Sequence, residues 1–209
     1  MKKVIIFDMD GVLVDTIPNA REAFLRRHPG VTADMYNEIH SGNYHTEAGK
    51  YAHLKITETG EEKERREADY AKVKSKTPLF NGIESLLNNL HSKGYILVLN
   101  TNAYTKNCLP LLENLGIKNL FDFIATAEVS KDKVEKFKLI EEKYKISGKD
   151  MLFVTDALGD VKDANAAGVP TVAVTWGVHD RTYFERKKYS HLIGIIDTVE
   201  DLLKFTVGR

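Results

Sequence analysis

Short, continuous apolar runs constrain the fold of this chain more than any other feature of its sequence. Four of them read KVIIF (3–7), YILVLN (95–100), MLFVT (151–155) and TVAVT (171–175), and FDFIATA (121–127) is a weaker fifth. A run without alternating polar residues is typical of a strand that is covered on both faces, as in a parallel sheet. These runs therefore predict buried parallel strands.

Segments with the apolar spacing of amphipathic helices lie between these runs. They read NGIESLLNNLHSKG (81–94), DKVEKFKLIEEKYK (132–145) and DVKDANAAGVP (160–170). Gly168, with Pro170 just beyond it, is a typical end for the last of these helices. Strands and helices that alternate along a chain predict an α/β domain with an open parallel sheet.

Residues 15–77 break this alternation, because they hold helical patterns and no strong strand candidate. The segment GEEKERREADYAKVKSK (60–76) is dense in charge, and we expect it to present a solvated helix face. Thr59 and Glu62 fit a capping box at its start. We therefore predict a small helical unit, residues 15–77, inserted into an α/β core of residues 1–14 and 78–209.

Composition and charge disfavour several classes of function. The chain has 209 residues, of which 30 are basic and 30 acidic, so its formal net charge is zero. This balance leaves no electrostatic footprint for nucleic acid or anionic membrane, and no apolar stretch approaches the ~20 residues that span a bilayer. The single cysteine, Cys108, cannot form an intramolecular disulfide, so we expect a packed thiol in a soluble, cytoplasmic protein.

Two pairs of aspartates follow two of the predicted strands. VIIFDMDG places Asp8 and Asp10 at the end of the first run, and LFVTDALGD places Asp156 and Asp160 after another. Ligands of open parallel sheets bind beyond the carboxyl ends of the strands. Carboxylates crowded there repel one another unless a cation separates them, and Mg²⁺ prefers oxygen ligands. We therefore predict that these four aspartates form a magnesium site.

Groups that suit a phosphate follow other predicted strands. Thr101 and Asn102 end YILVLNTN, where a hydroxyl and an amide can hold phosphate oxygens. Because carboxylates alone would repel a phosphate dianion, the site also needs a cation. EVSKDKVEKFK offers Lys131 and Lys133 for this purpose.

These motifs resemble those of the haloacid dehalogenase superfamily of phosphotransferases, and the resemblance covers the whole chain. DMDGVLVDT resembles the first motif, VLNTN the second, SKDKVEKF the third and TDALGDVKDANAAGV the fourth. The tail, from VPTVAVTWGVHDR to IDTVEDLL, is similar to phosphoglycolate phosphatase-like members of subfamily I. The resemblance implies a Rossmannoid α/β core with a helical cap domain of the C1 type inserted after the first strand.

The resemblance also implies a role for each aspartate. Asp8 would be the nucleophile that forms a phosphoaspartate and would bind Mg²⁺. Asp10 would act as acid and base, and its backbone carbonyl would also bind Mg²⁺. Asp156 would bind the metal directly, with Asp160 in support. Dehalogenating members resemble this chain but lack the second aspartate of the first motif, so Asp10 favours phosphate chemistry.

The other motif residues would bind the phosphoryl group. Thr101 and Asn102 would hold its oxygens, and Lys131 would balance the charge of Asp8 and the phosphate. Lys131 is preferred because Phe137 then falls where the family has an aromatic residue. Lys133 remains the alternative.

The segment HSGNYHTEAG (40–49) resembles the loop between cap helices that reaches toward the core. Gly42, Asn43 and His45, together with Tyr44, are therefore the predicted substrate-selecting residues. A site closed by a cap favours a small phosphorylated metabolite over a polymer.

We thus predict a Mg²⁺-dependent phosphatase that hydrolyses a small phosphomonoester, phosphoglycolate or a similar compound, through a phosphoaspartate. A β-phosphoglucomutase-like phosphomutase would share every core residue and stays open as the alternative. A phosphate-binding regulatory protein without turnover is a remote third possibility. We expect a monomer or a homodimer.

Overall fold

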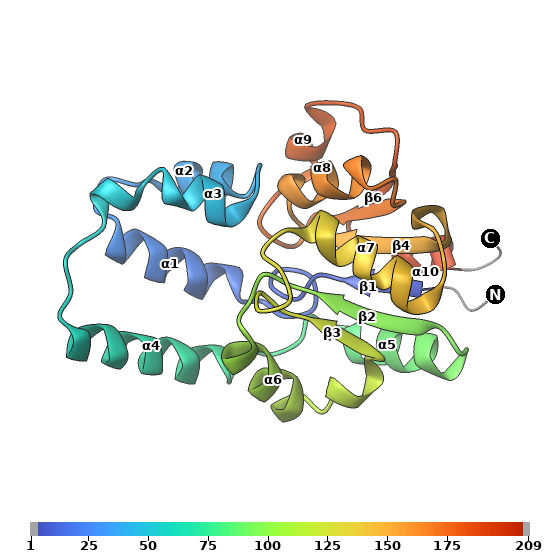
Figure 1. Ribbon diagram of the computed structural model, residues 1–209, viewed down its shortest axis with the longest axis horizontal. Coiled ribbons are helices and arrows are strands. Elements are labelled where there is room, and N and C mark those ends of the chain that lie inside the picture. Colours follow the sequence, from blue (N-terminus) through green and yellow to red (C-terminus); the bar gives the residue numbers. More distant parts are fainter. Residues whose placement is uncertain (1–3, 207–209) are drawn as a thin grey trace.

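The computed structural model describes residues 4–206 and contains one sheet of six parallel strands (Figure 1). The strands lie in the order β3-β2-β1-β4-β5-β6. They span Val4–Phe7 (β1), Ile96–Asn100 (β2), Phe123–Ala125 (β3), Met151–Thr155 (β4), Thr171–Val174 (β5) and Leu192–Ile196 (β6). The chain builds outward from β1 to β3 and then, on the other side, from β4 to β6. The point where this order reverses lies at β1, which is where ligands of such sheets bind.

All five predicted strands are present, and Lys3 of the first predicted run lies outside the described residues. The sixth strand, β6, was not predicted. It is an edge strand that is mostly half-buried, and Gly194 interrupts its apolar pattern. A Cβ at Gly194 would lie 2.3 Å from the ring of Phe205, so a contact distant in sequence explains this glycine.

Helices cover both faces of the sheet (Figure 1). On one face, Leu86, Leu87 and Leu90 of α5 pack with Ile5 and Phe7 of β1. The helices of this face are α5 (Ile83–Ser92), α6 (Thr105–Asn114) and, near the end of the chain, α10 (Leu203–Thr206).

The opposite face has its own apolar cluster, in which Phe137 and Ile140 pack against Ile6, Val98 and Phe153. The alternation of side chains along each strand therefore fills two cores, one on each side. The helices here are α7 (Lys133–Tyr144), α8 (Leu158–Ala166) and α9 (Arg181–Glu185). Short 3-10 helices lie at Ala52–Leu54 (η1), Lys118–Leu120 (η2), Gly148–Asp150 (η3) and Glu200–Leu202 (η4).

The segment between β1 and β2 contains helices and no strand among residues 17–74, as predicted (Figure 1). We call α1 to α4 with their connections the helical insertion; these helices span Ile17–Arg27 (α1), Ala33–Ile39 (α2), Tyr44–Gly49 (α3) and Gly60–Lys74 (α4). The predicted capping box of Thr59 and Glu62 starts α4. The two chain segments that connect the insertion to the core lie side by side, because Val14 pairs with Leu79. The exact domain division stays a prediction.

One sequence expectation about the insertion is wrong. Residues 40–49 were expected to form a loop, but Tyr44–Gly49 is helix α3 and only residues 40–43 connect it to α2. The side chain of Asn43 explains the early start, since its oxygen accepts a hydrogen bond from the Thr46 N–H at 3.3 Å and so caps the helix.

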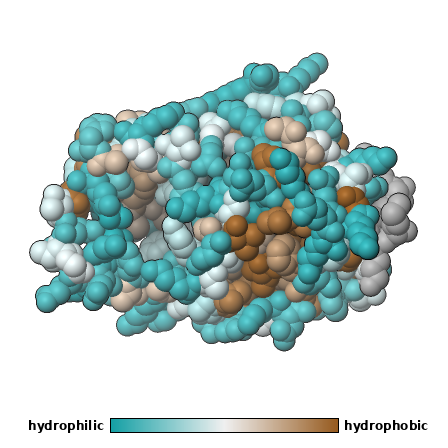
Figure 2. All heavy atoms as spheres, viewed as in Figure 1, coloured by the Kyte–Doolittle hydropathy of each residue, from teal (hydrophilic) through white to brown (hydrophobic). Residues whose placement is uncertain are grey.

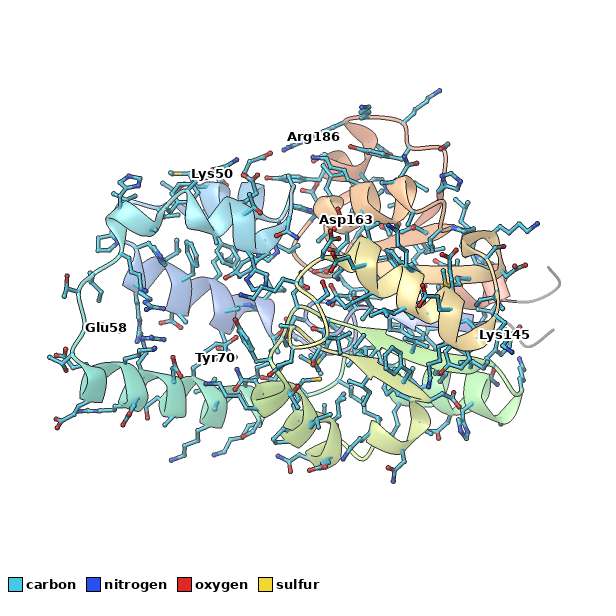
Figure 3. All side chains as sticks on the ribbon, viewed as in Figure 1. Lys50, Glu58, Tyr70, Lys145, Asp163 and Arg186 are labelled. Carbon is cyan, nitrogen blue, oxygen red and sulfur yellow. The ribbon has the colours of Figure 1, made fainter. Side chains whose placement is uncertain are left out.

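The helical insertion packs beyond the carboxyl ends of the strands (Figure 1). The N–H of Gly159 in α8 donates to the His40 carbonyl at 2.8 Å, and a Cβ at Gly159 would lie 2.2 Å from the Gly42 oxygen. Farther out, Arg186 pairs with Glu38 of α2 at 2.9 Å; Figure 3 shows Arg186 beside α9. The connection between α2 and α3 is therefore held against the start of α8.

The surface is mostly hydrophilic, with an apolar patch near the β2–β3 side of the sheet, as Figure 2 shows. None of the helices in residues 4–206 has the length and apolar character needed to cross a membrane. Cys108 is fully buried in α6, as expected for a packed thiol, and burial raises its pKa to about 12.

Candidate active site

The first two aspartates lie where β1 ends. Asp8 follows the last residue of the strand, and Gly11 turns the chain with a φ of +77°. A Cβ at Gly11 would lie 1.9 Å from a carboxylate oxygen of Asp156, at the end of β4. Gly11 therefore has two functions: it adopts a left-handed conformation, and it leaves room for the carboxylate of the neighbouring strand.

Asp8 is held in place by two hydrogen bonds. Its Oδ1 accepts from the Met9 N–H at 2.7 Å, and its Oδ2 accepts from Nζ of Lys133 at 2.7 Å. Burial raises the pKa of Asp8, and the ammonium of Lys133 opposes this rise. The ionised form of Asp8 thus depends on cations beside it.

The lysine that contacts Asp8 is Lys133, so the choice of Lys131 was wrong. Asp132 caps α7 by accepting from the Val134 N–H at 2.7 Å, which places Lys133 in the first turn of the helix. The side chain of Lys133 is 2% exposed and also contacts Asp160 at 2.5 Å. Lys131 precedes the cap and is exposed. Phe137 is buried in either case, so the aromatic position did not discriminate between the lysines.

Asp156 and Asp160 have different surroundings. Asp156 accepts from the Val178 N–H at 2.7 Å and makes no ion pair with a described residue. Burial, and then the charge of Asp8, raise its pKa well above the usual range. Asp160 contacts Lys133 and accepts from the Thr155 hydroxyl at 2.8 Å. Burial disfavours the charge of Asp160, but Lys133 outweighs this and lowers its pKa.

The residues around Asp156 fit a hard divalent cation. A fully buried carboxylate without a cation is unfavourable, and glycines at 11 and 177 leave open the space beside it. No three His, Cys, Asp or Glu side chains converge as a metal cluster among residues 4–206. Mg²⁺ does not require one, because it is commonly held by one or two carboxylates and completes its shell with water and phosphate. Asp8 and Asp156 are the carboxylates placed for this, whereas Asp160 is engaged in orienting Lys133.

A second buried lysine, which the sequence analysis missed, supports the loop after β2. Nζ of Lys136 donates to the Thr101 carbonyl at 2.8 Å and to Oδ1 of Asn102 at 3.0 Å. Lys133 and Lys136 lie one turn apart on α7 and both are fully buried. Burial and then repulsion from Lys133 lower the pKa of Lys136 to about 7. Their spacing of three residues places both lysines on one face of the predicted helix, but it does not show that this face turns inward.

The carboxylate of Asp10 faces the helical insertion. Its Oδ1 accepts from the Thr16 hydroxyl at 2.6 Å and pairs with Nζ of Lys74 at 2.7 Å. Lys74 is the last residue of α4 and only 5% exposed, although its segment was expected to present a solvated face. Burial opposes the charge of Lys74, but Asp10 outweighs it and raises the lysine pKa.

These groups surround a cavity of about 240 Å³ between the sheet edge and the helical insertion. Residues of the core form one end of the cavity and the insertion forms the other; the lining includes Asp8, Asp10, Thr101, Asn102, Lys133 and Asp160 from the core, and Tyr36, His40, Gly42, Tyr44, His45, Tyr70 and Lys74 from the insertion. Among the predicted substrate-selecting residues, Gly42, Tyr44 and His45 reach the cavity.

Asn43 is not part of the cavity lining, so its predicted contact with substrate is not found. Its side-chain oxygen caps α3, and its amide donates to the Lys131 carbonyl at 3.2 Å. The residue therefore connects the helical insertion to the segment before α7. The predicted residue Lys131 thus contributes only a backbone carbonyl here.

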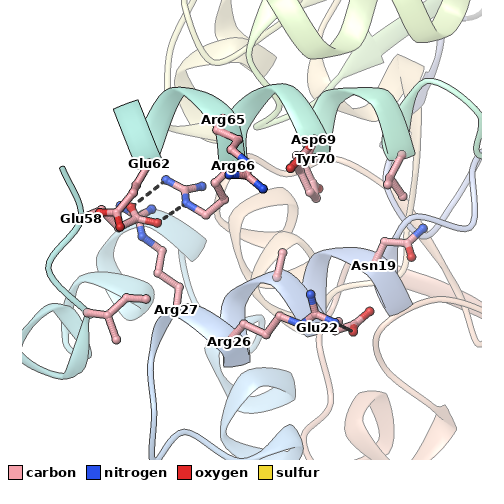
Figure 4. A pocket seen from close by; sticks show the side chains of 13 residues that line it. Asn19, Glu22, Arg26, Arg27, Glu58, Glu62, Arg65, Arg66, Asp69 and Tyr70 are labelled. Carbon is pink, nitrogen blue, oxygen red and sulfur yellow. Dashed lines mark hydrogen bonds and ion pairs between the residues drawn. The ribbon is translucent and has the colours of Figure 1, made fainter. Parts of the chain in front are cut away.

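A second hollow, of about 450 Å³, lies between α1 and α4 (Figure 4), where the surface in Figure 2 is also hollowed. Three of its four arginines are already paired: Arg66 contacts Glu58 at 2.6 Å, Arg27 contacts the same carboxylate at 3.3 Å, and Arg26 contacts Glu22. None of the sheet-edge aspartates lines it. The cavity at the sheet edge is therefore the candidate active site.

Two curated relatives span nearly the whole chain. The phosphoglycolate phosphatase of Mesorhizobium japonicum is 26% identical over 198 residues, which cover 86% of each chain. That of Yersinia pestis is 29% identical over 221 residues, covering 95% of this chain and 90% of the relative. Both names agree with the predicted resemblance.

A solved structure and a family model complete the comparison. A protein from Thermotoga maritima described as a β-phosphoglucomutase is 23% identical, with a TM-score of 0.74 and coverage of 99% of this chain and all of its own, which shows a shared fold. A model of the haloacid dehalogenase-like hydrolase family matches residues 2–168. Because this match spans most of the chain and includes every aspartate of the site, the protein belongs to the haloacid dehalogenase-like hydrolases.

Proposed function

We propose that this protein is a magnesium-dependent phosphatase that hydrolyses a small phosphomonoester through a phosphoaspartate on Asp8. The observation that carries the proposal is the environment of Asp8. A buried carboxylate at the end of the central strand contacts a buried lysine, and it lies close to the Asp156 carboxylate, which forms no ion pair with a described residue. This arrangement suits a phosphoryl group and a dication placed together.

In the first step, the Asp8 carboxylate attacks phosphorus and the ester oxygen leaves. Thr101 and Asn102 line the cavity beside Asp8 and would hold the phosphoryl oxygens. Lys133 would balance the charge that Asp8 and the phosphate bring together, and Asp160 and Thr155 keep that lysine oriented. A bound Mg²⁺, held by Asp8 and Asp156, would neutralise phosphate charge.

Asp10 is the group placed to transfer the proton. It lines the same cavity as Asp8, and its hydrogen bond with Thr16 fixes its orientation. It would protonate the leaving oxygen in the first step. In the second step water attacks the phosphorus of the phosphoaspartate, the bond between phosphorus and the Asp8 oxygen breaks to release phosphate, and Asp10 would take the proton from that water. Nζ of Lys74 pairs with Oδ1 of Asp10 at 2.7 Å, so this lysine also holds the carboxylate in place.

The cavity supports a small substrate. A volume of about 240 Å³ lies below the usual range of ~300–1,000 Å³ for drug-sized ligands. The names of the curated relatives suggest 2-phosphoglycolate as the first ester to test. The likeness to a β-phosphoglucomutase concerns the fold alone, so mutase activity is an outcome of the test.

The test is phosphate release from a panel of esters, including 2-phosphoglycolate, phenyl phosphate and hexose phosphates, with Mg²⁺ and with EDTA. We expect turnover that needs Mg²⁺ and that is lost in Asp8→Asn. Turnover that persists in Asp8→Asn would contradict the phosphoaspartate. If the folded, Mg²⁺-loaded protein releases no phosphate from any ester, the phosphatase proposal fails and conversion of sugar phosphates with a bisphosphate primer should be measured.

A further inference from the structure

We propose that the leaving group of the substrate is an uncharged, hydroxyl-bearing carbon chain, such as a polyol or sugar, bound by tyrosine hydroxyls and imidazoles of the helical insertion. This inference rests on the proposed phosphatase function and specifies its substrate class. It differs from 2-phosphoglycolate, which carries a carboxylate next to the ester carbon. The argument concerns the end of the cavity that faces away from Asp8.

Three tyrosines from separate helices line this end of the cavity. Tyr36 lies on α2, Tyr44 on α3 and Tyr70 on α4. Figure 3 shows Tyr70 between α4 and α1. None of their hydroxyls makes a hydrogen bond to another residue in the described part of the chain, although Tyr36 is only 2% exposed. Burial raises the pKa of all three, so each presents a neutral hydroxyl that can donate or accept.

Two histidines contribute unpaired ring nitrogens. The Nε2 atoms of His40 and His45 are buried and have no hydrogen-bond partner among residues 4–206, and both residues line the cavity. Burial lowers the pKa of each imidazole, that of His40 to about 4, so both rings are neutral near pH 7. Buried polar atoms without a partner are costly, and hydroxyl groups of a bound ligand would satisfy them.

The rings also form a continuous wall. His40 lies between Tyr36 and Tyr44, with ring centroids 5.0 and 5.1 Å apart, and His45 follows Tyr44 at 5.7 Å. Such a wall offers apolar ring faces to C–H groups and polar edges to hydroxyls. A polyol or sugar carries both kinds of group on each carbon.

The charges in the cavity disfavour a carboxylate at this position. Two cations line the cavity, Lys74 and Lys133, and both are paired: Lys74 with Asp10 at 2.7 Å and Lys133 with Asp8 at 2.7 Å. A substrate carboxylate would have to displace Asp10 from Lys74 and would lie beside the Asp10 charge. An uncharged group avoids both costs.

Other cations lie in a different hollow. A groove of about 720 Å³ shares Tyr44 and Tyr70 with the cavity and is lined by Lys55, Lys63 and Lys106. None of these three lysines lines the cavity itself. The inference therefore applies to the two or three carbon atoms that follow the ester oxygen, which must lie inside the cavity.

Two matched pairs of esters test the proposal. 2-Hydroxyethyl phosphate differs from 2-phosphoglycolate, and glycerol 3-phosphate from 3-phosphoglycerate, only by CH₂OH in place of the carboxylate. We expect kcat/KM to be about tenfold higher for the uncharged ester of each pair, which corresponds to about 1.4 kcal/mol. Ratios above threefold in both pairs support the proposal, and a ratio below threefold in either pair overturns it.

A single hydroxyl can be removed to test the binding groups. In Tyr44→Phe we expect kcat/KM for glycerol 3-phosphate to fall three- to tenfold, mainly through KM, as for the loss of one neutral hydrogen bond. The kcat/KM of Tyr44→Phe for phenyl phosphate, whose leaving group carries no further hydroxyl, should change less than twofold. Tyr51→Phe is the matched control, because Tyr51 lies in the same insertion but outside the cavity lining. Equal losses for glycerol 3-phosphate and phenyl phosphate would contradict the proposed hydrogen bond.

Phenyl phosphate also separates this inference from the proposed function. If phenyl phosphate is hydrolysed in an Asp8-dependent way but neither uncharged ester is, the phosphatase stands and the inference is overturned. If the folded, Mg²⁺-loaded protein hydrolyses no ester, including phenyl phosphate, the proposed function fails and the inference fails with it.

Discussion

At the scale of single residues, the site depends on which lysine reaches Asp8. The two lysines are two residues apart: Lys131 precedes the N-cap of α7, and Lys133 is the first residue of that helix. Only Lys133 lies inside the first turn, where its side chain reaches both Asp8 and Asp160. The helix boundary set by the Asp132 cap thus decides which lysine takes part.

The two lysines give a direct comparison. We expect Lys133→Met to lower kcat/KM by at least a hundredfold, because the Asp8 and Asp160 carboxylates lose their shared cation. We also expect it to reduce the free energy of unfolding by about 3–5 kcal/mol, the usual cost of breaking a buried ion pair. Lys131→Met should change both quantities little, since that side chain is exposed. Phosphate release and urea unfolding measure the two effects, and equal losses in both variants would contradict the assignment.

The surroundings of His40 predict that the protein becomes less stable in acid. Its pKa is lowered to about 4 by burial and then by repulsion from His179, with Asp160, Asp10 and Lys133 also nearby. The folded state thus disfavours the protonated ring. The free energy of unfolding should fall as the pH drops from about 6.5, the usual histidine value, to about 4.

Two variants test this prediction: His40→Gln and, as a control, His91→Gln on the exposed face of α5. Urea unfolding between pH 7 and pH 4 should show a smaller loss of stability in His40→Gln than in the wild type. His91→Gln should follow the wild-type slope. An unchanged slope in His40→Gln would show that another group causes the acid sensitivity.

At the scale of the elements, α4 and α7 show how a charge-rich helix can serve a site. Most of α4 is exposed, as its composition predicts, but its last residue Lys74 is buried on Asp10. α7 likewise has exposed lysines and the buried pair Lys133 and Lys136. Charge density predicts the exposed face of such a helix but not which charged residues turn inward.

The contact between α8 and the connection of residues 40–43 can be tested with glycines. A Cβ at Gly159 would lie 2.2 Å from the Gly42 oxygen, so Gly159→Ala should push the helical insertion away from the core. We expect KM to rise about tenfold or more with a smaller effect on kcat, because the insertion lines the end of the cavity that faces away from Asp8, where we propose that the leaving group binds. Gly49→Ala is the control, since a Cβ there meets nothing within 4 Å.

Gly49→Ala should leave KM unchanged and stabilise α3 by up to about 1 kcal/mol, the usual helix preference of alanine over glycine. Phosphate release at varied ester concentration and thermal unfolding measure the two effects. An unchanged KM in Gly159→Ala would show that the insertion adjusts without cost.

At the scale of the whole molecule, the sheet brings together groups that are about 150 residues apart in sequence. Asp8 follows β1 and Asp156 follows β4, and these strands are hydrogen-bonded neighbours. The same edge receives Thr101 from β2 and, through the insertion, Lys74. The site therefore exists only in the folded chain, and a ligand that binds there should stabilise the fold.

Magnesium binding provides that test. Saturating Mg²⁺ should raise the Tm, and at 100 times its Kd it should add about 2.7 kcal/mol to the free energy of unfolding. Asp156→Asn should abolish this shift, because it removes one of the two carboxylates placed for the metal. Asp15→Asn, which changes an exposed aspartate of the first motif, should keep the shift. Differential scanning calorimetry with Mg²⁺ and with EDTA measures the shift, and a full shift in Asp156→Asn would contradict the metal assignment.

The sequence by itself determined the α/β class, five of the six strands and the aspartates of the sheet edge. The reason is that these features are local: continuous apolar runs mark buried parallel strands, and their carboxyl ends necessarily share one edge. Strand β6 was not predicted because it is a half-buried edge strand, and its Gly194 is explained by a contact with Phe205, which is distant in sequence.

Only the tertiary structure decided which polar residues reach the cavity. Lys133, Lys136, Lys74 and His40 resemble their exposed neighbours in composition, and Asn43 was expected at the substrate but caps a helix instead. Helix boundaries fix the direction of each side chain, and the packing of the insertion on the core fixes what each one meets. Both depend on contacts between distant segments, which a local sequence pattern does not contain.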